Sequence, residues 1–185
     1  MAVDSEDSFV RALECVCTAQ PPDGMTTTII AIDGFGGVGK STLAAVIAEH
    51  VTADIVHTDD FASWDVPLDW WPRLRDQVLI PLSRNQGARY QRYDWGTRAL
   101  AEWIEIAPGG LVLIEGVSSS RVAFRPFLSR SIWVDAPRET RLSRGLERDG
   151  VGAREQWRRW MADEDAWASE ESPADHADCT VSGTE

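Results

Sequence analysis

Glycines, a lysine and a serine at fixed spacing make residues 34–41 a candidate phosphate-binding loop. The segment satisfies the pattern G-x-x-x-x-G-K-[ST] and reads Gly34-Phe35-Gly36-Gly37-Val38-Gly39-Lys40-Ser41. Glycine allows tight turns with positive φ, which point backbone N–H groups at an anion. In this pattern the lysine reaches the β- and γ-phosphates, and the serine hydroxyl ligates Mg²⁺. The sequence therefore predicts that ATP and Mg²⁺ bind through Gly34, Gly36, Gly37, Val38, Gly39, Lys40, Ser41 and Thr42.

Lys40 is the only lysine among 18 basic residues, so every other basic residue is an arginine. A compact ammonium group fits between phosphates where the planar guanidinium of arginine does not. The chain keeps a lysine at the position where this difference in shape matters for phosphate binding. The structural alternative for the segment is a glycine-rich turn without a ligand.

Carboxylates follow two apolar segments that are typical of buried strands. Glu115 follows residues 111–114 and resembles the acidic Walker B position, where a carboxylate holds Mg²⁺ directly or through water. Asp59 and Asp60 follow residues 53–57, and one of the two could accept a proton from an attacking hydroxyl group. The alternatives are structural: a turn or helix-capping carboxylate for Glu115, and a turn-forming pair for the aspartates.

Arginines recur every three or four residues after Pro137, which places several of them on one face of a helix. These residues are Arg138, Arg141, Arg144 and Arg148. Phosphoryl transfer develops negative charge, which arginines on a mobile segment can neutralise while they exclude water. We therefore expect a lid over about residues 138–160, with its turn at residues 149–152. A solvated helix face is the alternative.

Nine tryptophans are an unusual number for a chain of 185 residues. Core packing accounts for most of them. Trp64 follows the aspartate pair, and its large flat apolar surface suits the wall of an acceptor pocket for a ring-bearing ligand.

Strand-like and helix-like segments alternate along the chain, which indicates βαβ units and a parallel sheet. We expect strands at residues 28–32, 53–57, 111–114, 131–134 and 179–181, and helices at residues 5–18, 42–50, 67–84 (in two pieces) and 97–106. Residues 1–24 are expected to form an N-terminal helical addition to a single domain. The predicted fold is a three-layer P-loop NTPase α/β sandwich, with about five parallel strands, helices on both faces and an arginine-bearing lid. In such a sheet the phosphate loop, the aspartates and Glu115 meet at the carboxyl edge.

Composition limits the class of protein. A chain of 185 residues that is 43% hydrophobic fits one domain with a full core. The net charge of −12 argues against binding to nucleic acid or to a membrane surface, because both need clustered basic residues. Three cysteines without a Cys-x-x-Cys pair fit a reducing compartment, and no apolar segment has the length of a signal or membrane span. We therefore expect a soluble cytoplasmic protein, and homo-oligomerisation stays open.

Residues 28–149 resemble the uridine kinase and phosphoribulokinase group of P-loop kinases, which includes nicotinamide riboside kinase. The resembling motifs are Ile32-Asp33-Gly34 through Ser41-Thr42-Leu43-Ala44, Asp59-Asp60-Phe61, Tyr93-Asp94, Ile114-Glu115-Gly116 and Thr140-Arg141-Leu142-Ser143-Arg144. The resemblance implies an ATP-dependent kinase that phosphorylates a hydroxyl group of a small molecule, with a nucleoside as the favoured acceptor. It implies Asp59 as the general base, and Lys40, Arg144 and Arg148 as catalytic cations.

The same resemblance assigns substrate binding to Phe61, Tyr93 and Asp94, with Asp94 holding an acceptor hydroxyl group. Trp64 joins this predicted set as the wall of the acceptor pocket. Gly145 stands where the group often has an arginine. Two alternatives stay open: a kinase for a metabolite that is not a nucleoside, and a nucleotide-binding regulatory protein with little kinase activity.

Overall fold

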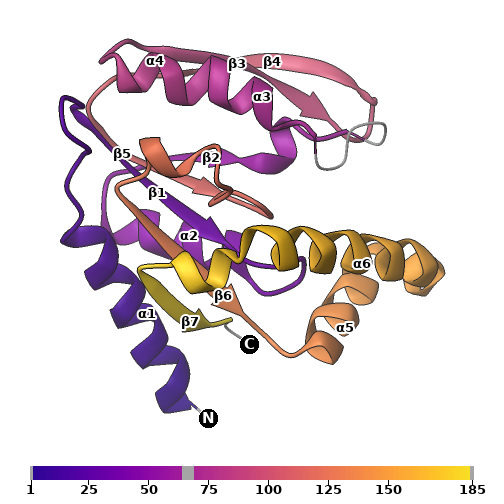
Figure 1. Ribbon diagram of the computed structural model, residues 1–185. Helices are drawn as coiled ribbons and strands as arrows, with labels where there is room; N and C mark the ends of the chain where they lie inside the picture. The colour runs from indigo at the N-terminus through magenta and orange to yellow at the C-terminus, as the bar shows by residue number, and fades with distance from the viewer. Residues whose placement is uncertain (1, 64–68, 184–185) are drawn as a thin grey trace.

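A parallel sheet of five strands forms the centre of the molecule (Figure 1). The computed structural model describes residues 2–63 and 69–183. The strands are β1 (Thr27–Asp33), β2 (Asp54–His57), β5 (Gly110–Glu115), β6 (Arg130–Asp135) and β7 (Cys179–Ser182), in the spatial order β2-β5-β1-β6-β7. Each neighbouring pair is parallel. The predicted α/β fold is confirmed.

The register of the strands brings their carboxyl ends to one edge of the sheet. Glu115 of β5 pairs with Ile32 of β1 on one side and with His57 of β2 on the other. Because each of these residues lies at or next to the end of its strand, the loops that follow begin side by side. Two of these loops carry the glycine-rich segment and Asp59.

Side chains of the strands alternate between two cores, because neighbouring residues of a strand face opposite sides. Ile30 and Ile32 are fully buried on the side of α1 (Ala2–Cys17) and α2 (Lys40–His50). Ile29 is fully buried on the opposite side, where a further helical run and a hairpin lie above the sheet in Figure 1. Helices therefore cover both faces.

The second helical run consists of α3 (Trp71–Leu74), a π-helical stretch (Arg75–Leu79) and α4 (Ile80–Ser83). Pro72 lies within the first two positions of α3, where the missing N–H group of proline costs little. Pro81 lies inside the continuous helical run, directly after the π-helical stretch, and its missing N–H group interrupts the hydrogen-bond ladder there. The two predicted pieces are joined without a loop, and the π-helical stretch connects them.

The segment predicted as a helix over residues 97–106 is strand β4 (Ala99–Ile106), so that prediction is wrong. This strand pairs in antiparallel fashion with β3 (Ala88–Asp94), and the two form a hairpin outside the main sheet. The ring of Trp103 lies 4.3 Å from the guanidinium of Arg89 on the partner strand, a cross-strand contact that stabilises the pair. Long-range pairing, rather than the local spacing of apolar residues, decides the structure of this segment.

The last two helices are α5 (Arg138–Asp149) and α6 (Arg154–Glu171), and they are joined at Gly150, which has φ 88°. They pack on each other through Leu146, Trp157 and Met161. In Figure 1 they lie beside the carboxyl ends of the central strands. This is the region for which the sequence predicts a lid.

Candidate nucleotide and acceptor site

The glycine-rich segment turns from β1 into α2 at the carboxyl edge of the sheet. Gly34, Gly37 and Gly39 have φ values of 146°, 80° and 99°, which residues with a side chain rarely adopt. Space at Gly37 is also limited, because a Cβ atom there would lie 2.5 Å from the carbonyl oxygen of Arg141. Gly39 is the N-cap of α2, so the free N–H groups of the helix face the loop. The turn and the helix N terminus together fit nucleotide phosphates.

Lys40 begins α2 and is only 7% exposed. Its ammonium group donates a hydrogen bond to the carbonyl oxygen of Phe35 across the loop, at 2.9 Å. Val38 is fully buried in the core below the loop, so its side chain anchors the turn and only its backbone can meet a phosphate. The loop therefore presents one cation and a set of backbone donors.

Ser41 and Glu115 meet at the foot of the loop, where the sequence predicts Mg²⁺. The Ser41 hydroxyl lies 3.1 and 3.2 Å from the two carboxylate oxygens of Glu115. A hydroxyl and one carboxylate suit Mg²⁺, which fills its other positions with waters and nucleotide phosphate oxygens. Within the described residues, no three His, Cys, Asp or Glu side chains gather into a metal site of their own. These two side chains would therefore hold Mg²⁺ together with a nucleotide.

His57 also belongs to this site, although the sequence motifs do not include it. Its Nδ1 lies 2.5 Å from Oε1 of Glu115, and this hydrogen bond raises the pKa of His57. The strand register sets the contact, because His57 pairs with Glu115 across β2 and β5. One feature of the sequence points to His57: it is the last residue of the predicted strand that precedes Asp59.

Asp33 connects the glycine-rich segment to the turn that follows β5. Its carboxylate is 1% exposed and accepts hydrogen bonds from the backbone N–H groups of Gly34, Ser118 and Ser120, at 2.7, 2.9 and 2.7 Å. Burial raises the pKa of Asp33, and its hydrogen bonds, first those from Ser120, lower it. With its oxygens occupied in this way, Asp33 fixes the start of the phosphate loop.

The two aspartates after β2 have different surroundings. They lie in a short 3-10 helix, Thr58–Asp60, and not in a continuing strand. Asp60 is 9% exposed and accepts a hydrogen bond from the Tyr90 hydroxyl at 3.0 Å, whereas Asp59 is solvent-accessible. Partial desolvation by the surrounding protein raises the pKa of Asp59, and the charge of Glu115 raises it further. Asp59 is therefore the aspartate that a second substrate can reach.

Arg144 and Arg148 approach the site from α5. Nη1 of Arg144 donates a hydrogen bond to the carbonyl oxygen of Gly37 in the phosphate loop, at 3.3 Å. Arg148 pairs with Asp149 at 2.8 Å, and its charge also lies near enough to Asp59 to lower the pKa of that carboxyl group. The arginine stripe is therefore not a wholly solvated helix face.

Arg141 and Glu164 connect α5 and α6 to the phosphate loop. The Arg141 guanidinium is 4.2 Å from the ring centroid of Phe35 and 3.8 Å from the carboxylate of Glu164. Glu164 is fully buried and accepts a hydrogen bond from the N–H group of Gly36, at 2.9 Å. Glu164 could not be predicted as a site residue, because one acid in an acidic segment carries no signal of its own.

The residues predicted to bind the acceptor do not form one surface. Phe61 is 2% exposed, and its ring packs against Tyr90 at a centroid distance of 4.7 Å, so it belongs to the core. Asp94 accepts a hydrogen bond from the N–H group of Thr97 at 2.7 Å, which closes the turn of the β3–β4 hairpin and lowers the pKa of Asp94. Trp64 lies outside the described residues.

Tyr93 and Trp95 place the hairpin beside the aspartates. Their rings meet edge to face at a centroid distance of 5.4 Å. Nε1 of Trp95 donates a hydrogen bond to the carbonyl oxygen of Asp59, at 3.0 Å. Trp95 was not predicted as a site residue, and its hydrogen bond is what ties the hairpin to the Asp59 turn.

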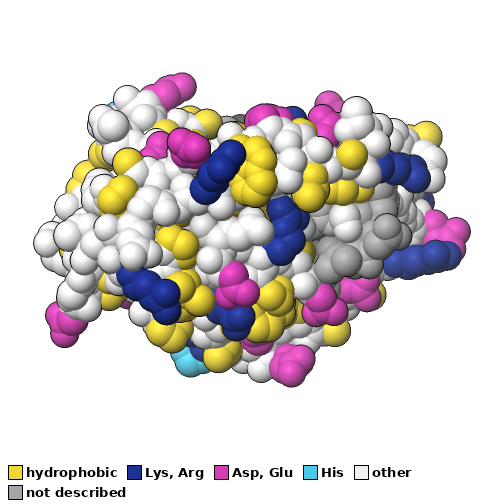
Figure 2. All heavy atoms as spheres, turned by 90° about the horizontal axis from the view of Figure 1, so that it is seen from above, with side chains coloured by type: hydrophobic (Ala, Val, Ile, Leu, Met, Phe, Trp, Pro, Cys, Tyr) yellow, Lys and Arg dark blue, Asp and Glu magenta, His cyan; other side chains and the backbone are white. Residues whose placement is uncertain are grey.

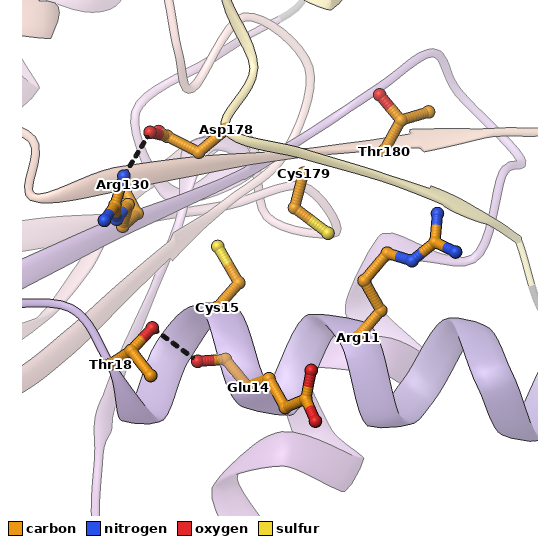
Figure 3. Close-up of a pocket in the computed structure, with 8 residues that line it drawn as sticks. All are labelled: Arg11, Glu14, Cys15, Thr18, Arg130, Asp178, Cys179 and Thr180. Atoms are coloured by element: carbon orange, nitrogen blue, oxygen red, sulfur yellow. Dashed lines mark hydrogen bonds and ion pairs between the residues drawn. The ribbon is translucent and has the colours of Figure 1, made fainter.

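A separate hollow of about 620 Å³ lies between α1 and β7, and none of the predicted site residues lines it. Figure 3 shows Cys15 and Cys179 facing each other there, beside the ion pair of Arg130 and Asp178 at 2.7 Å. Burial raises the pKa of Cys15 to about 11, so its thiol is uncharged and a poor nucleophile at neutral pH. All three cysteines, including Cys17, are described, and none of them is in a disulfide.

On the face that Figure 2 shows, basic and acidic side chains are interspersed with hydrophobic ones. In the part of the chain that the structure describes, no helix combines the length and the apolar character needed to cross a membrane.

Comparisons with known proteins agree with this geometry. The sequence model of the family described as AAA domain matches residues 30–165, whereas no curated protein sequence matches the chain. Among solved structures, a candidate uridine kinase from Bacillus stearothermophilus superposes with a TM-score of 0.71 at 18% identity, over 98% of this chain and 100% of its own.

Two further structures have the same fold. A candidate fructose transport system kinase from Silicibacter sp. TM1040 has a TM-score of 0.63 at 18% identity, over 93% of this chain and 98% of its own. D-glycerate 3-kinase from Cryptococcus neoformans has a TM-score of 0.57 at 13% identity, over 92% of this chain and 88% of its own. The chain thus has the fold of the P-loop kinases that its motifs resemble.

Proposed function

This chain belongs to the AAA domain family. We propose that it transfers the γ-phosphoryl group of ATP to a hydroxyl group of a small molecule. One observation carries the proposal: three features meet at the carboxyl edge of the sheet. They are the phosphate loop with its Ser41–Glu115 pair, the accessible carboxylate of Asp59, and the α5 arginines that reach toward both. An accessible carboxylate at this point can accept the proton of an acceptor hydroxyl group.

In the proposed complex the loop N–H groups and Lys40 bind the β- and γ-phosphates of ATP. Ser41 and Glu115 would hold Mg²⁺, which would neutralise part of the phosphate charge. Arg144 lies at the loop carbonyl of Gly37, where its guanidinium can turn to the γ-phosphoryl oxygens as α5 and α6 close as a lid.

The chemistry follows from the position of Asp59. The acceptor hydroxyl oxygen attacks the γ-phosphorus, and the bond from that phosphorus to the β–γ bridging oxygen breaks. The proton of the hydroxyl group passes to the carboxylate of Asp59. Because its surroundings raise the pKa of Asp59, this carboxylate is a stronger base than an ordinary aspartate.

The motifs and the similar structures support a small hydroxyl compound as the acceptor, but they do not agree on one compound. The sequence motifs favour a nucleoside, while the similar structures include proteins described as kinases of uridine, of a fructose transport system and of D-glycerate. We propose nucleosides, sugars and hydroxy acids as the compounds to test. Under the regulatory alternative, the chain binds ATP and transfers no phosphoryl group.

The test is an acceptor panel with ATP and Mg²⁺. We expect at least one compound to accelerate ADP release above the rate of hydrolysis without acceptor, and to gain one phosphoryl group by mass spectrometry. The same compound must give no product with the Lys40→Ala variant, whose folding is checked by thermal unfolding. Tight ATP binding without any phosphorylated product would favour the regulatory alternative.

A further inference from the structure

The turn that follows Glu115 contains buried polar atoms without partners. Ser118 and Ser119 are fully buried, and neither hydroxyl group has a hydrogen-bond partner among the described residues. The same holds for the buried Nε of Arg121, two residues further along the turn. An unsatisfied buried donor costs free energy, so a group of them in one turn requires a physical explanation.

Arg121 is the charged member of this group. It is 6% exposed, and its guanidinium makes no hydrogen bond or ion pair with the described part of the chain. Its Cζ lies 5.6 Å from the ring centroid of Trp70 and 5.5 Å from that of Trp71. Ring contacts of this kind occupy the faces of a guanidinium and leave the N–H groups along its edge for an anion.

Nearby carboxylates do not take up these N–H groups. Burial lowers the pKa of Arg121, and the charges of Glu171, Asp33 and Asp69 raise it in that order. Oε2 of Glu171 accepts the N–H group of Val122 at 2.6 Å, and the oxygens of Asp33 are held by the phosphate-loop and turn donors described above. Arginine stays charged inside a protein, so the turn holds a cation whose N–H groups have no acceptor among the described residues.

Two contacts place this turn against the segment that carries Asp59. A Cβ atom on Gly116 would lie 1.8 Å from Oγ1 of Thr58, so the two backbones are in close contact just before Asp59. On the other side, the ring of Trp70, which lies on Arg121, is 6.3 Å from the ring of Phe61. Through Trp70, Arg121 therefore adjoins the aromatic cluster of Phe61, which begins two residues after Asp59.

We propose that Arg121 binds an anionic group of the acceptor, a carboxylate or a phosphate, with Ser118 and Ser119 as further donors. This inference rests on the proposed kinase function. A guanidinium binds two oxygens of such a group side by side, and its burial strengthens both hydrogen bonds. A neutral nucleoside has no anionic group to accept the N–H groups of Arg121. The acceptor class is therefore an anionic hydroxyl compound, such as a hydroxy acid or a sugar phosphate.

Matched pairs of acceptors that differ by one anionic group test this inference. Glycerate with glycerol and gluconate with glucose test a carboxylate, ribose 5-phosphate with ribose tests a phosphate, and uridine is the neutral nucleoside. We expect kcat/KM for the anionic member to exceed that of its neutral partner by ~10-fold or more, the scale of a charge-assisted hydrogen bond. Arg121→Gln should remove this preference by raising KM for the acceptor, with KM for ATP nearly unchanged.

Arg125→Gln is the matched control, because Arg125 lies in the same turn and has partners. Its guanidinium donates to the carbonyl oxygens of Ser120 at 3.2 Å and Glu171 at 2.7 Å. We expect this variant to lose stability and keep the preference for anionic acceptors. Arg121→Lys keeps the charge without the planar fork, so it should retain part of the preference even if Arg121→Gln does not fold.

A measurement of phosphate binding tests the anion site even if no compound of the acceptor panel is phosphorylated. Inorganic phosphate is titrated by calorimetry into protein whose phosphate loop is saturated with a non-hydrolysable ATP analogue and Mg²⁺. Phosphate binding to wild type, its loss in Arg121→Gln and weaker binding in Arg121→Lys would support the anion site even if no panel compound is phosphorylated, in which case only the kinase proposal fails. Equal or absent phosphate binding in wild type and variants, or a preference for the neutral acceptors, would overturn the inference and identify Arg121 as a structural residue.

Discussion

The two neighbouring aspartates should separate catalysis from stability when each is changed to asparagine. Asp59→Asn removes the proposed base but keeps the size of the side chain. Loss of a positioned base costs ~10²-fold or more in turnover, which is about 3 kcal/mol in activation free energy. We expect ATP affinity to stay nearly unchanged. The stability of the fold should change by less than about 1 kcal/mol, because Asp59 is solvent-accessible and close to the like charge of Glu115.

Asp60→Asn should give the opposite result. Asp60 is 9% exposed and accepts the hydrogen bond of Tyr90, which is 1% exposed. Asparagine can still accept this bond, but a bond to a neutral oxygen is weaker than one to a charged oxygen by about 1 kcal/mol. Burial raises the pKa of Asp60, so removal of its charge offsets part of this loss, and we expect a fall of about 2 °C or less in the unfolding midpoint. Turnover should fall by much less than in Asp59→Asn.

The assay combines steady-state kinetics on a working acceptor, ATP binding by calorimetry and thermal unfolding. Tyr90→Phe is the control, because it removes the same hydrogen bond from the donor side. If Asp60→Asn loses turnover and Asp59→Asn does not, the base is Asp60 and the reasoning from accessibility is wrong. If neither variant loses turnover, positioning and Mg²⁺ account for the whole of the catalysis.

The pH dependence of kcat/KM is a second test of Asp59 as the general base. A base must be deprotonated, so kcat/KM should fall as the pH decreases through the pKa of Asp59. Because desolvation and Glu115 raise that pKa, the acid limb should lie above the pH at which an ordinary aspartate titrates. The residual activity of Asp59→Asn should lack this limb. An unchanged acid limb in the variant would assign the titration to another group.

The remaining predictions concern the phosphate loop and the lid. Lys40→Arg should abolish turnover as completely as Lys40→Ala in the ADP-release assay, because a guanidinium does not fit between the phosphates; near-normal rates would refute the phosphate-loop assignment. Glu115→Gln should raise the Mg²⁺ concentration for half-maximal rate by ~10-fold, whereas overlaying Mg²⁺ titrations would remove Glu115 from the metal site. Arg144→Ala should lower kcat more than it raises KM for ATP, and a pure KM effect would place Arg144 on the ground-state nucleotide. Gly145→Ala should lower unfolding stability by about 1–3 kcal/mol although alanine favours helices, because its Cβ would meet Trp157; a more stable variant would contradict that packing.

Features set by adjacent residues could be predicted from the sequence. The phosphate loop follows from glycine spacing between a strand and a helix, and Glu115 follows from the end of an apolar segment. The parallel sheet follows from the alternation of such segments. In each case the decisive contacts are local or are imposed by the regular geometry of a parallel sheet.

Features set by distant residues could not be predicted. Residues 97–106 have apolar side chains at helical spacing, yet pairing with β3 makes them a strand. His57 meets Glu115 only through the register of two strands, and Glu164 meets Gly36 only because α6 folds back on the loop. Phe61 matches a substrate motif, but the aromatic cluster around it places the ring in the core.

Packing explains why this chain has Gly145 at a position where the kinase group that it resembles often has an arginine. No side chain fits there, because a Cβ atom would lie 2.3 Å from the ring of Trp157. That ring is fixed in place by its own hydrogen bond, in which Nε1 donates to Asp149 at 2.9 Å. Two other arginines of α5 contact the phosphate loop: Arg141, whose guanidinium lies on the ring of Phe35 and near Glu164, and Arg144, which donates to the carbonyl oxygen of Gly37. Close packing of α6 against α5 therefore leaves no room for an arginine at position 145.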